Sequence, residues 1–227
     1  MLVKGEIQNN LKAISGGLCA GKTTAAEYLK VNHKFNILGF ATPLYILCAI
    51  HHLPEERWKP GIKGWIAEYL VPTERYSEDQ LDEFLHQVLL AFDTTERDPG
   101  KNRTLLQRVG TEVGRAFDPD LWVNLFEDKL TSLGDDARVV NDNLRFPNEI
   151  EASDNLGFVK VYLDIDPELQ KKRYKTIYGK DLTKEQLSHK SEAHLELAYD
   201  RADAVFNNSY NRPEPLYAFL EDLLYGK

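Results

Sequence analysis

The sequence predicts an α/β protein in which helices cover both faces of a parallel β-sheet, giving three layers. Short apolar runs, several of them rich in β-branched residues, alternate along the chain with longer segments of helical spacing. That alternation is typical of α/β domains. Several of the runs lack a clean alternation of apolar and polar residues, which indicates strands that are buried on both faces of the sheet.

Five apolar runs are the expected strands, and five longer segments are the clearest expected helices. The strands are expected at 11–15 (LKAIS), 35–40 (FNILGF), 137–142 (ARVVND), 158–165 (FVKVYLDI) and 202–208 (ADAVFNN). The helices are expected at 24–31, 79–92, 104–117, 121–133 and 215–224. A further helix, rich in Lys and Arg, is expected after the fourth strand, beyond Pro167.

The second and third expected strands are separated by about a hundred residues, which is too long for one crossover and too structured for a linker. We expect this stretch to be an α-helical insertion, about 43–117, within a single domain of residues 1–227. Four aromatic residues of this stretch either stack on a ligand base or form a local core. They are Trp58, Trp65, Tyr69 and Tyr76.

The composition is that of an acidic globular protein. The chain has 227 residues, a net charge of −8, 42% hydrophobic residues and 28% charged residues. The negative charge argues against a nucleic-acid partner, because such surfaces collect Lys and Arg, although it is compatible with a small basic pocket. Two cysteines, Cys19 and Cys48, make no disulfide framework, so a cytoplasmic location is expected. No apolar run approaches the ~20 residues of a membrane span, so no membrane partner is expected.

The first expected strand leads directly into a phosphate-binding loop. Residues 16–23 match the template G-x-x-x-x-G-K-[ST]. The buried strand before the loop and the helix after it are the context that this template requires. The free N–H groups of that helix would point at an anion. Lys22 would reach the β- and γ-phosphates, and the Thr23 hydroxyl would bind Mg²⁺.

The rest of the chain favours a small kinase among the proteins that carry such a loop. The guanine-reading sequence N-K-x-D of a switch GTPase is absent. The basic helix beyond Pro167 suits a lid, about 166–190, that closes over a transferring phosphate. Arg173 is the best candidate on this helix, because a guanidinium suits bidentate phosphate contact. The alternative for the helix is a solvated charged face.

Six stretches together resemble the phage deoxynucleoside monophosphate kinase family, in that family's order and over most of the chain. The stretches that begin at Arg103 and Val139 are the most specific, through "LLQRVGTEVGR" and "LRFPNE". The six are the loop 16–23, 39–45 (GFATPLY), 103–123 (RTLLQRVGTEVGRAFDPDLWV), 139–152 (VVNDNLRFPNEIEA), 189–196 (HKSEAHLE) and 202–224.

The resemblance implies a P-loop kinase fold with a five-stranded parallel sheet, ATP as the phosphoryl donor and Mg²⁺ as the metal. It implies a deoxynucleoside 5′-monophosphate as acceptor, and a bacteriophage-encoded enzyme that works in the host cytoplasm. A homodimer is left open. The residues expected to bind ATP are Gly17, Cys19, Ala20, Gly21, Lys22, Thr23, Thr24 and Asn208.

Two departures from the family pattern concern acidic residues. The family usually reads Asp-x-Arg-Phe-Pro-Asn-Glu, whereas this chain has Asn143 two positions before Arg145 and its acid one step earlier, at Asp142. Either Asp142 takes the acidic role through a local shift, or that role is weakened. Several members also carry an acid directly after the loop lysine, where this chain has Thr23.

The catalytic residues expected on this basis are Lys22, Asp142, Arg145 and Arg173, with Thr23 and Asp142 as metal ligands. The expected acceptor-binding residues are Gln107, Arg108, Glu112, Arg145 and Glu149. Each has a plainer alternative. Asp142 could cap the helix that starts near Pro147, Arg145 and Glu149 could form an ion pair, and Arg108 and Arg115 could lie on the surface.

Two further segments carry weaker expectations. His189, Ser191 and Glu192 look like a helix cap, with Ser188 or Ser191 starting a helix that runs through Leu197, and they do not complete a metal site. Asn207 and Asn208 follow the last strand, either around the donor adenine or as a polar turn.

Two rival functions remain open. One is a related kinase that acts on a hydroxymethylated base in DNA, where Asp142 would be the general base that a hydroxyl acceptor needs. The other is a regulatory module that binds ATP and hydrolyses it slowly.

Overall fold

A computed structural model describes residues 10–98, 102–183 and 194–226 of the chain. The chain divides into two compact units. Residues Met1–Gly39 and Leu130–Lys227 form the first, which we call the sheet unit, and Phe40–Lys129 form the second, the helical unit.

The sheet unit contains a five-stranded sheet in which every pairing is parallel. The strands lie in the order β2-β3-β1-β4-β5, so the strand before the loop is central. Their bounds are β1 Leu11–Gly16, β2 Asn36–Ile37, β3 Val139–Asn141, β4 Val159–Asp164 and β5 Ala204–Asn207. Four of the strands lie within their expected runs and β1 extends one residue beyond its run, to Gly16, which confirms the α/β class and the parallel sheet.

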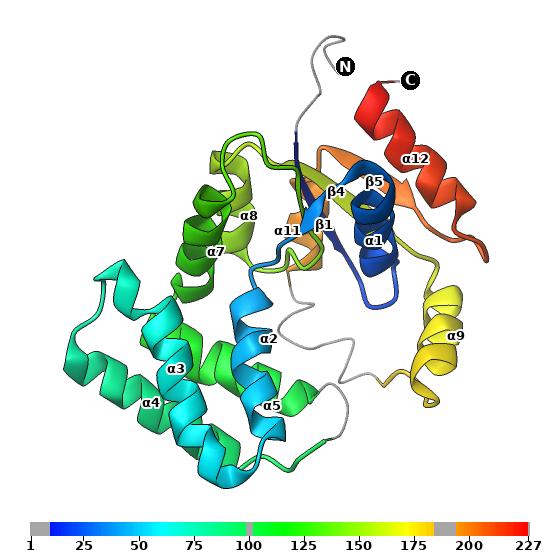
Figure 1. Cartoon of the computed structure of the whole chain (residues 1–227). Coiled ribbons are helices and arrows are strands. Elements are labelled where there is room, and N and C mark those ends of the chain that lie inside the picture. The colour runs from blue at the N-terminus through cyan, green and yellow to red at the C-terminus, as the bar shows by residue number, and fades with distance from the viewer. Residues whose placement is uncertain (1–9, 99–101, 184–193, 227) are drawn as a thin grey trace. The chain divides into compact units, whose positions relative to one another are not determined.

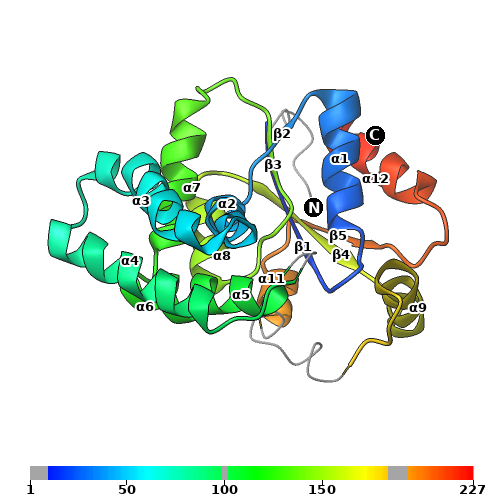
Figure 2. The same ribbon diagram turned by 60° about the horizontal axis from the view of Figure 1, so that its bottom comes forward.

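Helices cover both faces of this sheet (Figures 1 and 2). On one face α1 packs against α12, and on the other α11 packs against α8 and β1. The apolar sides of α1 and α12 form one core with the strands, in which Ala25, Leu29, Leu216 and Leu220 are almost fully buried. The helices of this unit are α1 Lys22–His33, α8 Pro147–Asn155, α9 Pro167–Tyr178, α11 Leu195–Asp200 and α12 Glu214–Tyr225.

The topology singles out the carboxyl ends of β1 and β3. These strands are neighbours, but β1 continues into α1 on one face and β3 continues into α8 on the other. Ligands of open parallel sheets bind where the connections of adjacent strands diverge in this way. A ligand is therefore expected to bind near the residues that follow Gly16 and Asn141.

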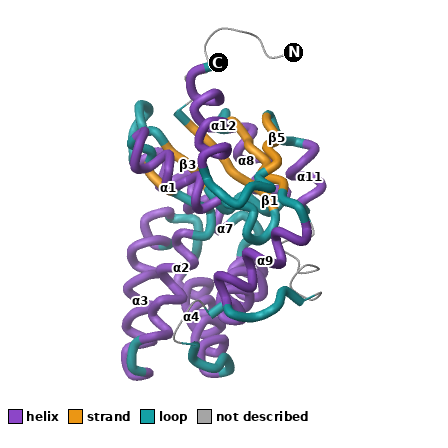
Figure 3. The backbone as a smooth tube through the Cα atoms, turned by 90° about the vertical axis from the view of Figure 1, so that its right-hand side faces the viewer, coloured by secondary structure: helices purple, strands orange, loops and turns teal. Residues whose placement is uncertain are grey.

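The helical unit lies in sequence between β2 and β3, and its described residues contain no strand (Figure 3). Its helices are α2 Thr42–Ala49, α3 Trp58–Tyr69, α4 Glu78–Asp93, α5 Arg103–Gln107, α6 Arg115–Phe117 and α7 Leu121–Ser132, with α7 ending in the sheet unit. Short 3₁₀ turns join several of them, at Ile50–His52, Glu55–Arg57 and Val71–Thr73.

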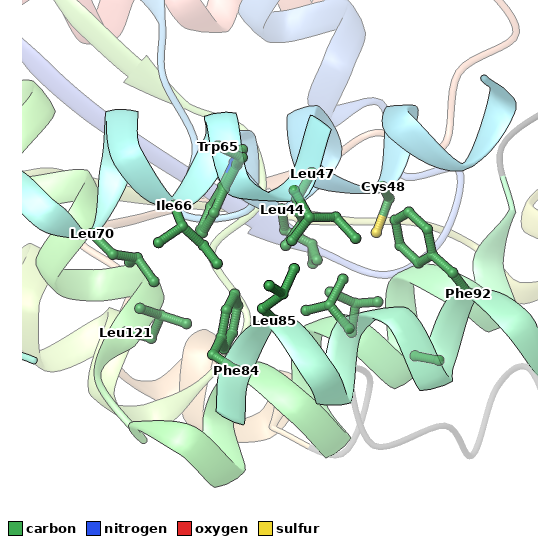
Figure 4. Close-up of a cluster of buried hydrophobic side chains, with 14 of the residues drawn as sticks. Leu44, Leu47, Cys48, Trp65, Ile66, Leu70, Phe84, Leu85, Phe92 and Leu121 are labelled. Atoms are coloured by element: carbon green, nitrogen blue, oxygen red, sulfur yellow. The ribbon is translucent and has the colours of Figure 1, made fainter. Parts of the chain in front are cut away.

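The helical unit has an aromatic and aliphatic core of its own (Figure 4). Trp65 stacks on Tyr69, and its indole N–H donates to the carbonyl oxygen of Pro43 at 3.0 Å. Trp58 is also buried, against His51 and Phe92. These aromatic residues therefore contribute to a local core.

The expected helix 104–117 is present, but its middle is wider than an α-helix. Residues Arg108–Gly114 form a π-helix between α5 and α6. The indole N–H of Trp122 donates to the carbonyl oxygen of Gly110 at 2.8 Å. Gly110 and Gly114 leave room for the side chains of Leu44 and Trp122, which a Cβ at either glycine would touch. A π-helix is rare and usually short, so the local packing rather than propensity accounts for it.

We predict that Gly114→Ala lowers the free energy of unfolding by about 1–3 kcal/mol, because the new Cβ would collide with the Trp122 ring and overpack the core. Gly64→Ala is the matched control. Gly64 lies inside α3, where a Cβ meets nothing within 4 Å. That change should be neutral or stabilise by up to about 1 kcal/mol. Urea unfolding of both variants measures the difference, and equal effects would contradict the packing argument.

The central strand also buries a lysine. Lys12 is 1% exposed in β1, and burial, together with the positive charge of Arg138, lowers its pKa to about 8. Because the unfolded chain keeps the ordinary pKa of about 10.5, burying the ammonium opposes folding fully below pH 8. Between pH 8 and 10.5 the folded state loses its proton first, so this penalty disappears as the pH rises.

We predict that Lys12→Met raises the free energy of unfolding at pH 7, by up to about 3 kcal/mol. This gain should shrink between pH 8 and 10.5. The measurement is chemical unfolding of the wild-type protein and the variant from pH 7 to 10.5. A gain that stays constant across this range would show that the ammonium carries no burial penalty.

Candidate functional site

The loop between β1 and α1 contains three residues with positive φ. Gly16 and Gly21 have φ values of 131° and 102°, and Cys19 lies in the left-handed region at 59°. A Cβ on Gly21 would lie 2.5 Å from Nδ2 of Asn208, and the φ of this residue is one that other residues rarely adopt, so the position favours glycine. The loop delivers the chain into the twelve-residue helix α1, which has no acidic residue in its first turn. Its N-terminus can attract an anion through the helix dipole and its N–H groups.

Lys22 lies over this loop. Its Nζ donates to the carbonyl oxygens of Gly16 at 2.6 Å and Gly17 at 2.8 Å. Both acceptors are neutral, and phosphate oxygens bind an ammonium more strongly because they are charged. Lys22 is therefore held at the loop in a position from which it can turn to an anion.

A hydrogen bond joins Thr23, at the start of α1, to Asp142, which follows the neighbouring strand β3. The Thr23 hydroxyl donates to Oδ2 of Asp142 at 3.2 Å. Asp142 follows β3 directly, whereas the Asn143 side chain lies against Gly39, in the space that a Cβ there would fill. The acid that meets the loop is thus Asp142, one position earlier than the family pattern places it.

The same pair fits the chemistry of Mg²⁺, which takes hard oxygen ligands and is commonly held by one or two carboxylates together with phosphate oxygens and water. Thr23 and Asp142 supply one hydroxyl and one carboxylate. Among the described residues, no group of three or more His, Cys, Asp or Glu side chains is placed to hold a metal ion. Thr23 and Asp142 could therefore hold a metal ion whose remaining ligands come from another molecule or from water.

A pocket of about 370 Å³ lies beside the loop, entirely within the sheet unit. Cys19 and the residues Gly21–Thr24 line one side of it. Ile177 and Tyr178 from the end of α9 line another, with Asn208 and the residues 210–213 after β5. Of the expected ATP-binding residues it thus brings together Cys19, Gly21, Lys22, Thr23, Thr24 and Asn208. Gly17 and Ala20 belong to the same loop but do not line the pocket.

Arg173 lies in this pocket wall, and its guanidinium donates to backbone carbonyl groups. Nη1 donates to Cys19 at 3.2 Å, and Nη2 donates to Asn208 at 3.1 Å and also to Tyr210. Burial lowers the pKa of Arg173. Nearby, Gln170 Nε2 donates to the carbonyl of Leu18 at 2.9 Å and Asn208 Nδ2 donates to that of Ala20 at 2.8 Å.

Sequence reasoning did not identify Gln170, Tyr210 or Arg212 as site residues, although Gln170 touches the loop and the other two line the pocket. The spacing of Gln170, Arg173 and Ile177 is three and then four residues, which puts them on one face of α9. That spacing is the signal that could have found Gln170.

Arg145 and Glu149 meet through the backbone. The buried Glu149 carboxylate accepts the N–H groups of Arg145 at 2.9 Å and Phe146 at 3.1 Å, through Oε2. This is the usual arrangement in which an acid at the third position of a helix caps its start, here α8. Glu149 therefore fixes the chain that carries Arg145.

The expected acceptor-binding residues Gln107, Arg108 and Glu112 belong to the helical unit. Arg108 Nη1 donates to the carbonyl of Thr94 at 2.9 Å and to the hydroxyl of Thr95 at 3.1 Å. Its Nε lies 3.9 Å from a carboxylate oxygen of Glu112. Gln107 ends α5, immediately before the π-helix. Arg115 donates to the carbonyl of Pro119 at 3.2 Å.

Part of the expected lid and the cap residues Ser188, His189, Ser191 and Glu192 lie outside the described residues. The described helix that follows is α11, preceded by His194. Asn207 accepts the N–H of Ser209 at 3.0 Å, as in a polar turn. Among the described residues, no helix combines the length and apolar character of a membrane span.

Comparison with known proteins shows little similarity. No family model matches the chain, and no curated protein matches it. Eight solved chains match. Among them is the crystal structure of TT1252 from Thermus thermophilus, at 19% identity and a TM-score of 0.44, with 93% of this chain and 96% of that chain covered.

We predict that Glu149→Leu lowers the free energy of unfolding by about 1–3 kcal/mol, because two backbone N–H groups would lose their acceptor. Glu149→Gln should lose less, since its amide oxygen can still accept. Glu151→Gln, at an exposed position of the same helix, is the control and should change stability by less than about 0.5 kcal/mol. Thermal unfolding measures all three. If Glu149→Leu were as stable as the control, Glu149 would not be a structural cap.

Proposed function

We propose that the protein is an ATP-dependent kinase of P-loop fold that converts a deoxynucleoside 5′-monophosphate to the diphosphate. The observation that carries the proposal is the hydrogen bond between Thr23 and Asp142. It joins the first turn of the helix after the loop to the carboxyl end of the neighbouring strand. A hydroxyl and a carboxylate in these positions are the protein ligands that P-loop enzymes use for Mg²⁺.

The phosphates of the donor would lie at the loop and the N-terminus of α1. The loop N–H groups and the helix dipole bind their negative charge, and Lys22 exchanges its two carbonyl acceptors for β- and γ-phosphate oxygens. Thr23 and Asp142 would hold Mg²⁺, which would supply neutralisation of the charge on the transferring phosphoryl group. The protein then needs only to hold the acceptor in line with the donor.

The pocket beside the loop supports a nucleoside as the rest of the donor. Its volume of about 370 Å³ falls in the range of small-molecule sites, about 300–1,000 Å³. Ile177, Tyr178 and Tyr210 give it apolar and aromatic lining next to the polar loop. This combination suits a flat base joined to a chain of phosphates.

The nature of the acceptor rests on the resemblance to the phage kinases. Arg145, in the "LRFPNE" stretch, is the proposed ligand of the acceptor phosphate, and α8 and the Glu149 cap hold its backbone. A phosphate acceptor is already ionised at neutral pH, so the reaction requires no general base. Gln107, Arg108 and Glu112 remain proposed contacts of the acceptor.

One experiment separates this proposal from its rivals. The protein is incubated with γ-labelled ATP, Mg²⁺ and a panel of nucleoside monophosphates, deoxynucleoside monophosphates and hydroxymethylated DNA. Label in a deoxynucleoside diphosphate is the expected result. Label only in DNA would support the kinase that acts on a modified base, and label only in free phosphate would support the ATP-binding module.

We predict that Lys22→Ala reduces turnover by orders of magnitude while the fold persists, because Lys22 is the ammonium at the transferring phosphate. Lys30→Ala is the matched control. It removes the same charge from the exposed far end of α1, where Lys30 pairs with Glu27, and turnover should stay within about twofold. Steady-state rates and circular dichroism test both. Near-normal turnover of Lys22→Ala would refute the mechanism.

A further inference from the structure

Three successive backbone carbonyl groups of the loop accept hydrogen bonds from side chains of other segments. Leu18 accepts from Gln170, Cys19 from Arg173 and Ala20 from Asn208, at 2.9, 3.2 and 2.8 Å. Two of the donors come from α9 and the third follows β5. All three lie far from the loop in the sequence, so the contacts are a product of the tertiary fold.

The direction of these carbonyl groups fixes the direction of the loop N–H groups. Among the described residues, which include the whole loop, there is no cis peptide bond, and across a trans peptide the N–H of one residue points opposite to the carbonyl of the residue before it. The N–H groups of Cys19, Ala20 and Gly21 are therefore turned away from the three donors. A flip of any of these peptides would present a carbonyl oxygen to an anion and would break one donor contact.

The donor side chains are themselves held in place. Asn208 is 4% exposed, and its backbone N–H donates to the carbonyl of Asp164 at the end of β4. Arg173 donates to the Asn208 carbonyl as well as to Cys19, and so ties the segment after β5 to the loop. Gln170 lies against Gly17, where a Cβ would come within 3.1 Å of its Nε2. The contacts form one connected network.

We propose that Gln170, Arg173 and Asn208 are positioning residues that keep the loop in its anion-binding conformation by holding these carbonyl groups. The proposal rests on the proposed function, in which the loop binds the phosphates of ATP. It assigns Arg173 a role through the loop backbone, which differs from direct contact with the transferring phosphate. The two roles predict different kinetic effects.

The test measures binding of inorganic tripolyphosphate and of ATP, each with Mg²⁺, by titration calorimetry, together with kcat and KM. The variants are Gln170→Leu, Arg173→Met, the double variant and Lys22→Ala. Lys172→Met is the control, because it removes the same charge as Arg173→Met from an exposed position of α9 that lies outside the pocket lining. Thermal unfolding without ligand checks each fold, and Arg173→Lys replaces Arg173→Met if the latter is unstable.

We expect Gln170→Leu and Arg173→Met each to weaken binding of both ligands by about three- to ten-fold, the value of one hydrogen bond. KM for ATP should rise in parallel, with kcat within twofold of the wild-type value. The double variant should lose less than the product of the single effects, because the first loss already releases the loop. Lys172→Met should bind both ligands within twofold of the wild-type protein.

Binding of both ligands within twofold by Gln170→Leu and Arg173→Met, with a loss of kcat in the latter, would overturn the inference. Arg173 would then contact the reacting phosphate, and the proposed kinase function would stand. If the wild-type protein bound neither tripolyphosphate nor ATP, the proposed function itself would fail, and this inference would fail with it.

Discussion

The turn from β1 into α1 is the constraint on which the candidate site depends. At Gly16 the chain leaves a central strand that is buried from Lys12 onward, and it must begin, at Lys22, a helix whose apolar side is fixed by the core. The backbone makes this connection with positive φ angles at Gly16, Cys19 and Gly21. The geometry that satisfies the core is also the one that points the start of α1 out of the carboxyl edge of the sheet, where charged ligands of such folds bind.

The layout of the fold could be predicted from the sequence because hydrophobic patterns report burial directly. The five strands and the longer helices follow from apolar runs and their spacing, and the loop follows from its glycines and lysine. The shortness of β2 could not be predicted in this way. Its apolar run extends over six residues, but ladder pairing requires a partner, and β3 pairs with only Asn36 and Ile37.

The residues of the candidate site also differ in how far the sequence could predict them. Thr23, Lys22 and Asp142 belong to local patterns, a loop template and a strand end, and these could be located in advance. The backbone acceptors of Gln170 and Arg173 could not, because a donor finds a backbone acceptor only when two segments far apart in the sequence have folded together. Glu149 is intermediate. Its spacing suggested a pair with Arg145, and as the third residue of α8 its carboxylate accepts the backbone N–H of that residue.

The π-helix at Arg108–Gly114 alters the phase of the helix that contains it. Its hydrogen bonds span five residues in place of four, so each turn takes up more residues than in an α-helix. In an α-helix, two residues seven positions apart lie on nearly the same side. In this segment the wider turns rotate the chain less per residue, so Arg115 does not come round to the side of Arg108. A helical wheel drawn across this segment would therefore assign its later residues to the wrong side. The two arginines donate to different backbone carbonyl groups, Arg108 to Thr94 and Arg115 to Pro119.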